Sequence, residues 1–430
     1  MVSMIMRTLW GDISREEFKK FGLLSSVFFF IIGAYWMLRL MKNALFTHII
    51  GSSGLPYAKI ISIVSLLLIV LFYNKLVDWL EKTKLVYLLA TFYGLLFLSF
   101  AYFLTHPTIG MPNSVADKSR IFGWVIYIAI ESFGSLVIAA FWSFVASVMD
   151  TASAKKGYPV IVSGAQLGSI TGSVLVMLLS TRLGMPALMC IATVSVLIVP
   201  FMIRIFAHHY ESVPSPQAVE KKQATGVLEG LKLIASRPYL MGVLVVSTVY
   251  EIISTVFDIL QTTSAKTTFG STEKVAEFLG IYGLATNTLS FLFALIGTSY
   301  FIRRLGLTAC LVTYPLMVAC LVGAVWIHPV LWTFFAAQVI MKGMSYALNN
   351  PCKEIMYIPT SKDVKFKAKS WIDVQGSRSA KALGAGIVAL SPLIAFSSVI
   401  SLGIIGLWIP VALFVGRTNS KLVRDGNIIE

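Results

Sequence analysis

Apolar stretches long enough to cross a lipid bilayer recur about twelve times along this chain, and they restrict its fold more than any other feature. A bilayer core of about 30 Å is crossed by about 20 predominantly apolar residues in an α-helix. Of the 430 residues, 57% are hydrophobic and 13% are charged, whereas soluble domains average about 25% charged residues. The sequence therefore predicts an all-α membrane protein with about 12 transmembrane helices.

The predicted spans fall into two groups of six. Their cores are 21–45, 57–74, 86–104, 121–147, 159–180, 185–206, 238–261, 278–300, 306–326, 329–350, 378–396 and 398–416. Polar connections divide the chain into an N-terminal segment 1–20, a six-helix half 21–206, a linker 207–237, a second half 238–416 and a tail 417–430. Lys and Arg residues gather in alternate connections, so the positive-inside rule places both termini in the cytoplasm. This pattern predicts a major-facilitator-like fold, in which each half is built of inverted three-helix repeats.

The formal net charge of +15 has two interpretations. A basic protein attracts anionic substrates, whereas basic cytoplasmic loops orient spans in the membrane. We favour the second interpretation for most of the charge, because the basic residues lie mainly between the spans.

Charged residues inside the spans are the exception, and they lie mainly on the first span of each predicted group of three. With the spans numbered in chain order, they are Arg39 and Lys42 in span 1, Glu131 in span 4, Glu251 and Asp258 in span 7, and Lys342 and Lys353 in span 10. At roughly 2.5–3.5 kcal/mol for one charge in mid-membrane, the set would cost about 15–25 kcal/mol if each residue were unpaired in lipid. We therefore expect these side chains to face a water-filled path or one another.

Their spacing favours a shared path. Steps of three and four residues place side chains on one face of an α-helix. Such steps join Tyr35, Arg39 and Lys42 in span 1, and Lys342, Tyr346, Asn349 and Lys353 in span 10. Basic and acidic groups that converge in this way suggest a substrate with several negative charges and a cationic or proton-linked partner. The alternative is a set of interhelical salt bridges that close gates, joining Arg39 or Lys42 to Glu131 or Asp258.

Four short motifs resemble those of the ATP:ADP antiporter family, the nucleotide transporters of plastids and obligate intracellular bacteria. The motifs are PCKEIMYIP with the following lysine-rich loop and IDV, LRLMKNALF at 38–46, IESFGS at 130–135, and the segment 250–258. Members of that family exchange ATP for ADP, import nucleoside triphosphates with protons, or carry other nucleotides such as NAD. The resemblance implies that Lys42, Glu131, Asp258 and Lys353 are critical for transport.

The chain also departs from the family pattern. Gln261 and Thr262 stand where the family typically has a tryptophan and a lysine, and Asn43 and Asn350 stand where it usually has aspartates. These departures favour a differently charged nucleotide or proton coupling over strict ATP:ADP exchange.

The resulting hypothesis is a carrier that moves nucleotides by alternating access, as an exchanger or a proton-coupled importer. Arg39, Lys42, Lys342 and Lys353 would bind phosphate oxygens, as arginine and lysine commonly do. Tyr35, Tyr346 and Asn349 would contact base or ribose. Glu131, Glu251 and Asp258 would serve gating or proton coupling.

Further expectations concern partners and location. The substrate is ATP, ADP or another anionic nucleotide, with protons as an alternative coupling partner. The resemblance implies the inner membrane of a bacterial cell, where we expect a multi-pass monomer in the lipid bilayer. We expect no bound nucleic acid, cofactor or metal, and no enzymatic activity. GxxxxGK[ST], HExxH and CxxC are all absent from the sequence, so phosphate-loop and zinc chemistry are not indicated.

Three alternatives remain. One is proton-linked transport of another phosphorylated organic anion, such as a sugar phosphate, or of NAD. A second is a membrane enzyme or scramblase acting on lipid, which would need a catalytic cluster near one interface. A third is a channel, which would favour rings of one charge sign.

Overall fold

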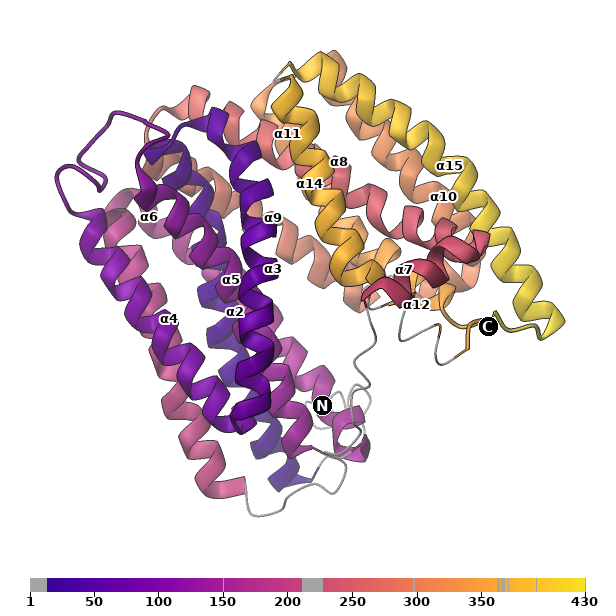
Figure 1. The fold of residues 1–430 in the computed structure, drawn as a ribbon, viewed down its shortest axis with the longest axis horizontal. Coiled ribbons are helices and arrows are strands. Elements are labelled where there is room, and N and C mark those ends of the chain that lie inside the picture. The colour runs from indigo at the N-terminus through magenta and orange to yellow at the C-terminus, as the bar shows by residue number, and fades with distance from the viewer. Residues whose placement is uncertain are drawn as a thin grey trace. The chain divides into compact units, whose positions relative to one another are not determined.

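The structure is a computed structural model, and it describes residues 14–149, 151–210, 227–296, 298–361, 364, 368–369, 371–391 and 393–429. Over these residues the regular elements are helices, and one isolated bridge pairs Thr360 with Ile429 (Figure 1). The helices of the N-terminal part are α2 (Arg15–Ile49), η1 (Ser52–Gly54), α3 (Leu55–Trp79), α4 (Lys82–Leu104), α5 (Ile121–Val148) and α6 (Thr151–Tyr210). The helices that follow are α7 (Val227–Ser236), α8 (Pro238–Phe269), α9 (Thr272–Ile296), α10 (Thr298–Ile327), α11 (Leu331–Met344), η2 (Ser345–Asn349), α12 (Asn350–Met356), η3 (Trp371–Gly376), α14 (Ser377–Leu390) and α15 (Ile394–Asp425). The predicted all-α fold is confirmed.

Within the described residues, nine helices are long and apolar enough to cross a membrane. One of them, Lys156–Tyr210, has 55 residues and is interrupted at Gly184, whose φ of 78° and ψ of 171° are not helical. Because glycine adopts positive φ without a steric penalty, it turns the chain between the predicted spans 159–180 and 185–206. The remaining predicted spans correspond to the continuous run α11–η2–α12 and to α14.

Helix α2 begins at a capping box, the arrangement in which two residues cap each other across the first turn. The Ser14 backbone N–H donates to the Glu17 carboxylate over 2.9 Å, and the Glu17 N–H donates to the Ser14 hydroxyl over 3.1 Å. These bonds satisfy backbone groups that have no partner inside the helix. The helix therefore begins at Arg15, before the apolar run itself.

The contacts between residues divide the chain into two compact units. The first comprises 1–54, 64–221 and 269–284. In it α2 packs closely along α6: a Cβ atom at Gly168 would lie 2.3 Å from the Phe29 backbone oxygen. The absence of a side chain there lets the two helix backbones approach, which is a common form of helix packing in membranes.

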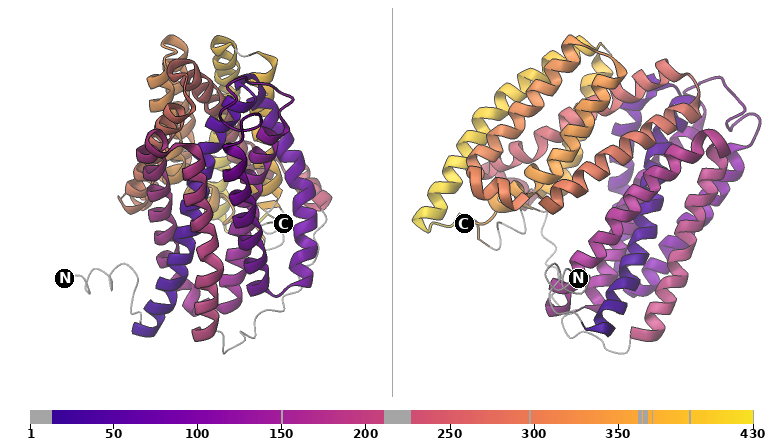
Figure 2. Two further views of the ribbon diagram at one scale, coloured as in Figure 1. Left: turned by 90° about the vertical axis from the view of Figure 1, so that its left-hand side faces the viewer. Right: turned by 180° about the vertical axis from the view of Figure 1, so that it is seen from behind.

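The second unit comprises 55–63, 222–268 and 285–430. Helices α10 and α15 lie side by side in it (Figures 1 and 2). Tyr314 of α10 packs between Tyr250 and Trp408, with ring centroids 5.9 Å and 5.7 Å away. This buried aromatic core lies next to the charged part of α8, because Glu251 directly follows Tyr250. The predicted halves 21–206 and 238–416 stay a prediction.

Candidate functional site

A buried lysine pairs with a carboxylate in the first unit. Lys42 of α2 is 4% exposed and forms an ion pair with Glu131 of α5. Tyr127, one turn before Glu131, places its ring 4.2 Å from the Lys42 Nζ atom. The carboxylate and the ring face both offset the cost of burying an ammonium group. This is one of the interhelical pairs named in the alternative interpretation of the sequence, in which the charges form salt bridges.

The other polar residues of span 1 lie along the same helix. The Arg39 guanidinium stacks 5.0 Å from the ring centre of Trp36. The Tyr35 ring lies against Gly134 of α5, where a Cβ atom would come within 2.2 Å of it. Tyr35 and Lys42 therefore both face α5, as their spacing of seven residues predicts.

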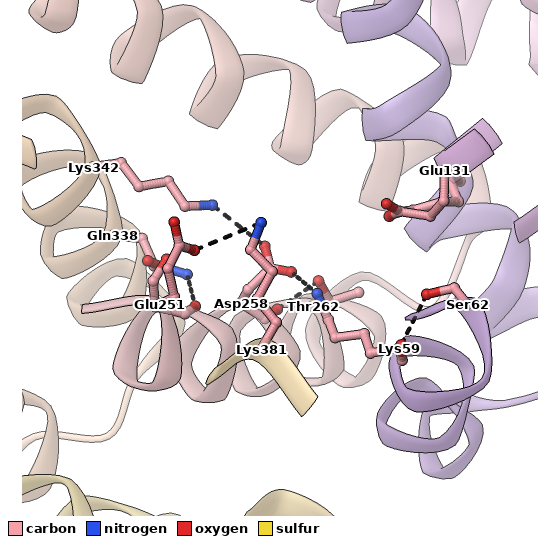
Figure 3. Close-up of polar contacts among 11 residues, drawn as sticks. Lys59, Ser62, Glu131, Glu251, Asp258, Thr262, Gln338, Lys342 and Lys381 are labelled. Carbon is pink, nitrogen blue, oxygen red and sulfur yellow. Dashed lines mark hydrogen bonds and ion pairs between the residues drawn. The ribbon is translucent and has the colours of Figure 1, made fainter. Parts of the chain in front are cut away.

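In the second unit one carboxylate is paired with two lysines. Asp258 of α8 accepts a hydrogen bond of 2.7 Å at Oδ2 from Lys59 of α3, and its Oδ1 lies 3.8 Å from the Nζ atom of Lys342 of α11 (Figure 3). The three side chains are between 11% and 20% exposed. Lys59 is missing from the predicted site. Its position inside the apolar span 57–74 could have pointed to it. The predicted site drew mainly on the charges of the first span of each group of three, and Lys59 lies on a second span.

A second acid on α8 has a weaker pairing. Glu251 lies 3.7 Å from the Nζ atom of Lys381 on α14, and about half of the Lys381 side chain is exposed. Lys353 of α12 also interacts electrostatically with Glu251 and with Asp373. Glu251 thus lies among cations from two other helices, and its exposure of 23% is close to the 20% of Asp258.

A buried amide holds α11 against α8. The side-chain nitrogen of Gln338 donates to the Ser254 backbone oxygen over 3.2 Å. Gln338 is fully buried and lies one helical turn before Lys342. The bond therefore fixes the part of α11 from which Lys342 reaches Asp258.

Span 10 is not one continuous α-helix. A π-helical segment, η2, separates α11 from α12. The prediction that Lys342, Tyr346, Asn349 and Lys353 share one α-helical face is therefore wrong, because a π turn contains one more residue than an α turn. Lys342 and Asn349 are buried whereas Tyr346 is 49% exposed. The Asn349 side-chain nitrogen is buried without a hydrogen-bond partner among the described residues.

These contacts give both units a common chemistry. Each holds one or more buried lysines against a carboxylate from another helix. A buried ion pair contributes little stability compared with apolar packing of the same volume. Such a pair is instead suited to reversible binding of an ion. The ion can take the place of one partner, and that partner can return when the ion leaves. Among the described residues no group of three or more His, Cys, Asp or Glu side chains could hold a metal ion.

The sequence of the chain has clear relatives. Residues 2–415 match the family described as TLC ATP/ADP transporter. ADP,ATP carrier protein 2, chloroplastic, of Arabidopsis thaliana is 26% identical, over 95% of this chain and 76% of that protein. ADP,ATP carrier protein 3 of Rickettsia bellii is 23% identical, over 98% of each.

Solved structures share the fold. The nucleoside transporter NupG matches with a TM-score of 0.59 at 13% identity, over 94% of this chain and 99% of that chain. A bacterial homologue of the iron transporter ferroportin, in an inward-facing state, matches with a TM-score of 0.65 at 12% identity, over 94% and 100%. At these identities the likeness concerns the fold alone, and it confirms the predicted major-facilitator-like architecture. The chain belongs to the TLC ATP/ADP transporter family, a family of membrane transporters and not of enzymes, as its motifs predicted.

Proposed function

We propose that this protein is a multi-pass membrane carrier that moves nucleotides across the bilayer by alternating access. The observation that carries the proposal is the pairing of buried or half-buried lysines with carboxylates in both units: Lys42 pairs with Glu131, and Lys59 and Lys342 pair with Asp258. Family membership and relatives named ADP,ATP carrier proteins support a nucleotide as the substrate.

The chemistry of transport would be an exchange of anions on the lysines. Lysine binds phosphate as a point charge, and hydrogen bonds between charged groups are stronger than those between neutral ones. A nucleotide that reaches Lys42 would replace Glu131, and its release would let Glu131 return. The lysine then stays neutralised in both states, which avoids the roughly 2.5–3.5 kcal/mol that a bare charge costs in mid-membrane.

The remaining residues take roles that fit their surroundings. Phosphate oxygens would be bound by Arg39, Lys42, Lys342 and Lys353. Base or ribose would contact Tyr35, Tyr346 and Asn349. The buried amide nitrogen of Asn349, which has no hydrogen-bond partner within the described part of the chain, is suited to donate to an acceptor on the nucleotide. Glu131, Glu251 and Asp258 would act in gating or in proton coupling.

The proposed setting is the inner membrane of a bacterial cell, with both termini in the cytoplasm and the protein acting as a monomer. The alternation of basic and non-basic connections supports this orientation. A relative from Rickettsia that aligns over nearly its whole length supports a bacterial membrane.

Uptake into proteoliposomes tests the function. Purified protein is reconstituted, and uptake of labelled ATP, GTP, UTP and NAD is compared in empty vesicles and in vesicles preloaded with ADP. We expect uptake of at least one nucleotide. A requirement for internal ADP would identify an exchanger, and stimulation of empty vesicles by an inward proton gradient would identify a proton-coupled importer. No nucleotide uptake under either condition, together with uptake of a labelled sugar phosphate, would overturn the proposal.

A further inference from the structure

Two lysines from different helices meet opposite oxygens of one carboxylate. Lys59 Nζ donates to Asp258 Oδ2 over 2.7 Å, and Lys342 Nζ lies 3.8 Å from Oδ1. In Figure 3 the two lysines approach Asp258 from opposite sides. Asp258 therefore bridges two ammonium groups that α3 and α11 hold in place.

The surroundings hold both lysines in position while leaving them accessible. Gln338 fixes α11 on α8 through the Ser254 carbonyl. The buried hydroxyls of Thr262 and Ser62 donate to the backbone oxygens of Asp258 and Lys59, each over 2.8 Å. None of the three charged side chains is completely buried. The cluster thus combines fixed helix contacts with side chains that keep between 11% and 20% of their surface exposed.

We propose that Lys59 and Lys342 form a phosphate subsite, and that Asp258 occupies this subsite when no substrate is bound. A phosphate group, like a carboxylate, presents two oxygens to two donors, and it carries more negative charge per group. The inference deepens the proposed function by adding Lys59, a residue that the motifs do not point to. It rests on the proposed function only for the identity of the natural substrate.

The arrangement makes Asp258 a competitor of the substrate. Removing the carboxylate should leave both ammonium groups available to an incoming anion, which strengthens anion binding. Removing Lys59 should weaken anion binding, since only Lys342 then remains. A purely structural role for the cluster would instead weaken binding in both variants. The sign of the Asp258 effect therefore separates the two explanations.

The test uses the purified full-length protein in detergent and inorganic pyrophosphate as the probe, with binding followed by the shift in thermal unfolding. We expect Lys59→Met to bind pyrophosphate about tenfold or more weakly than the wild type, as loss of a close charge partner commonly does. Asp258→Asn should bind it about threefold more tightly, because the internal competitor is gone. Lys75→Met, at an exposed position of the same helix, is the matched control and should bind as the wild type does.

Two further variants distinguish a loss of anion binding from a loss of folding. Lys59→Arg keeps the charge and should retain most of the binding. The double variant Lys59→Met with Asp258→Asn removes both charges of one pair and should bind pyrophosphate weakly. If the double variant binds as tightly as Asp258→Asn alone, Lys59 does not contact the anion and the subsite is wrong. Weaker binding by Asp258→Asn than by the wild type would overturn it as well.

The two proposals fail in different ways. Pyrophosphate has no base or ribose, so its binding does not depend on nucleotide transport. Wild-type protein that binds pyrophosphate through Lys59 but takes up no nucleotide would overturn the proposed function and leave the subsite standing. Nucleotide uptake with an unchanged KM in Lys59→Met would overturn the subsite and leave the function standing.

Discussion

Lys42 of α2 and Glu131 of α5, 89 positions apart in the sequence, form a buried ion pair against the ring of Tyr127. Both residues lie in apolar spans, so each needs a partner at membrane depth. Their pairing within one unit gives the most direct test of the proposed mechanism.

Replacing Lys42 with alanine should reduce nucleotide uptake to background in proteoliposomes. The variant removes the proposed phosphate contact and leaves Glu131 without its lysine. Glu131 is only partly buried, so we expect the protein still to fold, as size-exclusion chromatography and thermal unfolding would check. Lys84→Ala, in an exposed ion pair with Glu81, is the control and should transport normally. Wild-type uptake by Lys42→Ala would contradict the assigned role.

Replacing Gln338 with methionine should raise the KM for nucleotide and lower the free energy of unfolding by about 0.5–1.5 kcal/mol. The variant fills a similar volume but cannot donate to the Ser254 carbonyl, so α11 and Lys342 lose an anchor on α8. Thermal unfolding and uptake kinetics measure the two effects. Gln166→Met, at a half-buried position of α6, should change neither quantity. An unchanged KM would show that the amide does not position Lys342.

Replacing Gly168 with leucine should destabilise the first unit by about 1–3 kcal/mol. Even the Cβ atom would lie 2.3 Å from the Phe29 backbone oxygen, so α2 and α6 must separate. Gly22→Ala is the matched control on α2, where a Cβ atom meets nothing within 4 Å. That change should be neutral or stabilising by about 0.5–1 kcal/mol, because alanine is the better helix former. Equal melting temperatures for the two variants would be inconsistent with this packing.

Replacing Arg120 with methionine should loosen the connection between α4 and α5. The Arg120 guanidinium donates to the backbone oxygens of Ile109, Gly110, Asn113 and Val115 over 2.7–3.2 Å. Without these bonds, amide hydrogen exchange over 105–120 should become at least about tenfold faster, while exchange in α5 stays unchanged. Exchange at the wild-type rate would show that the loop is held by other contacts.

The sequence by itself determined the helical fold and most of the spans, and it included the Lys42–Glu131 contact among the possible ion pairs. Span length and the cost of a charge in lipid are local properties, so the apolar runs and the charges inside them are visible without a structure. The same reasoning predicted that Lys42 could meet Glu131, because both occupy the first helix of a three-helix group. The roles assigned to the site residues stay predictions until transport is measured.

Only the tertiary structure decided which partners Asp258 has and how span 10 is built. Lys59 and Asp258 are 199 positions apart, and no spacing rule relates them, because helix packing decides which side chains meet. The π-helical segment at Ser345–Asn349 changed the expected face of span 10, since a regular α-helical period had been assumed there. Charges and apolar length belong to the sequence, whereas the choice of partner depends on how the helices pack.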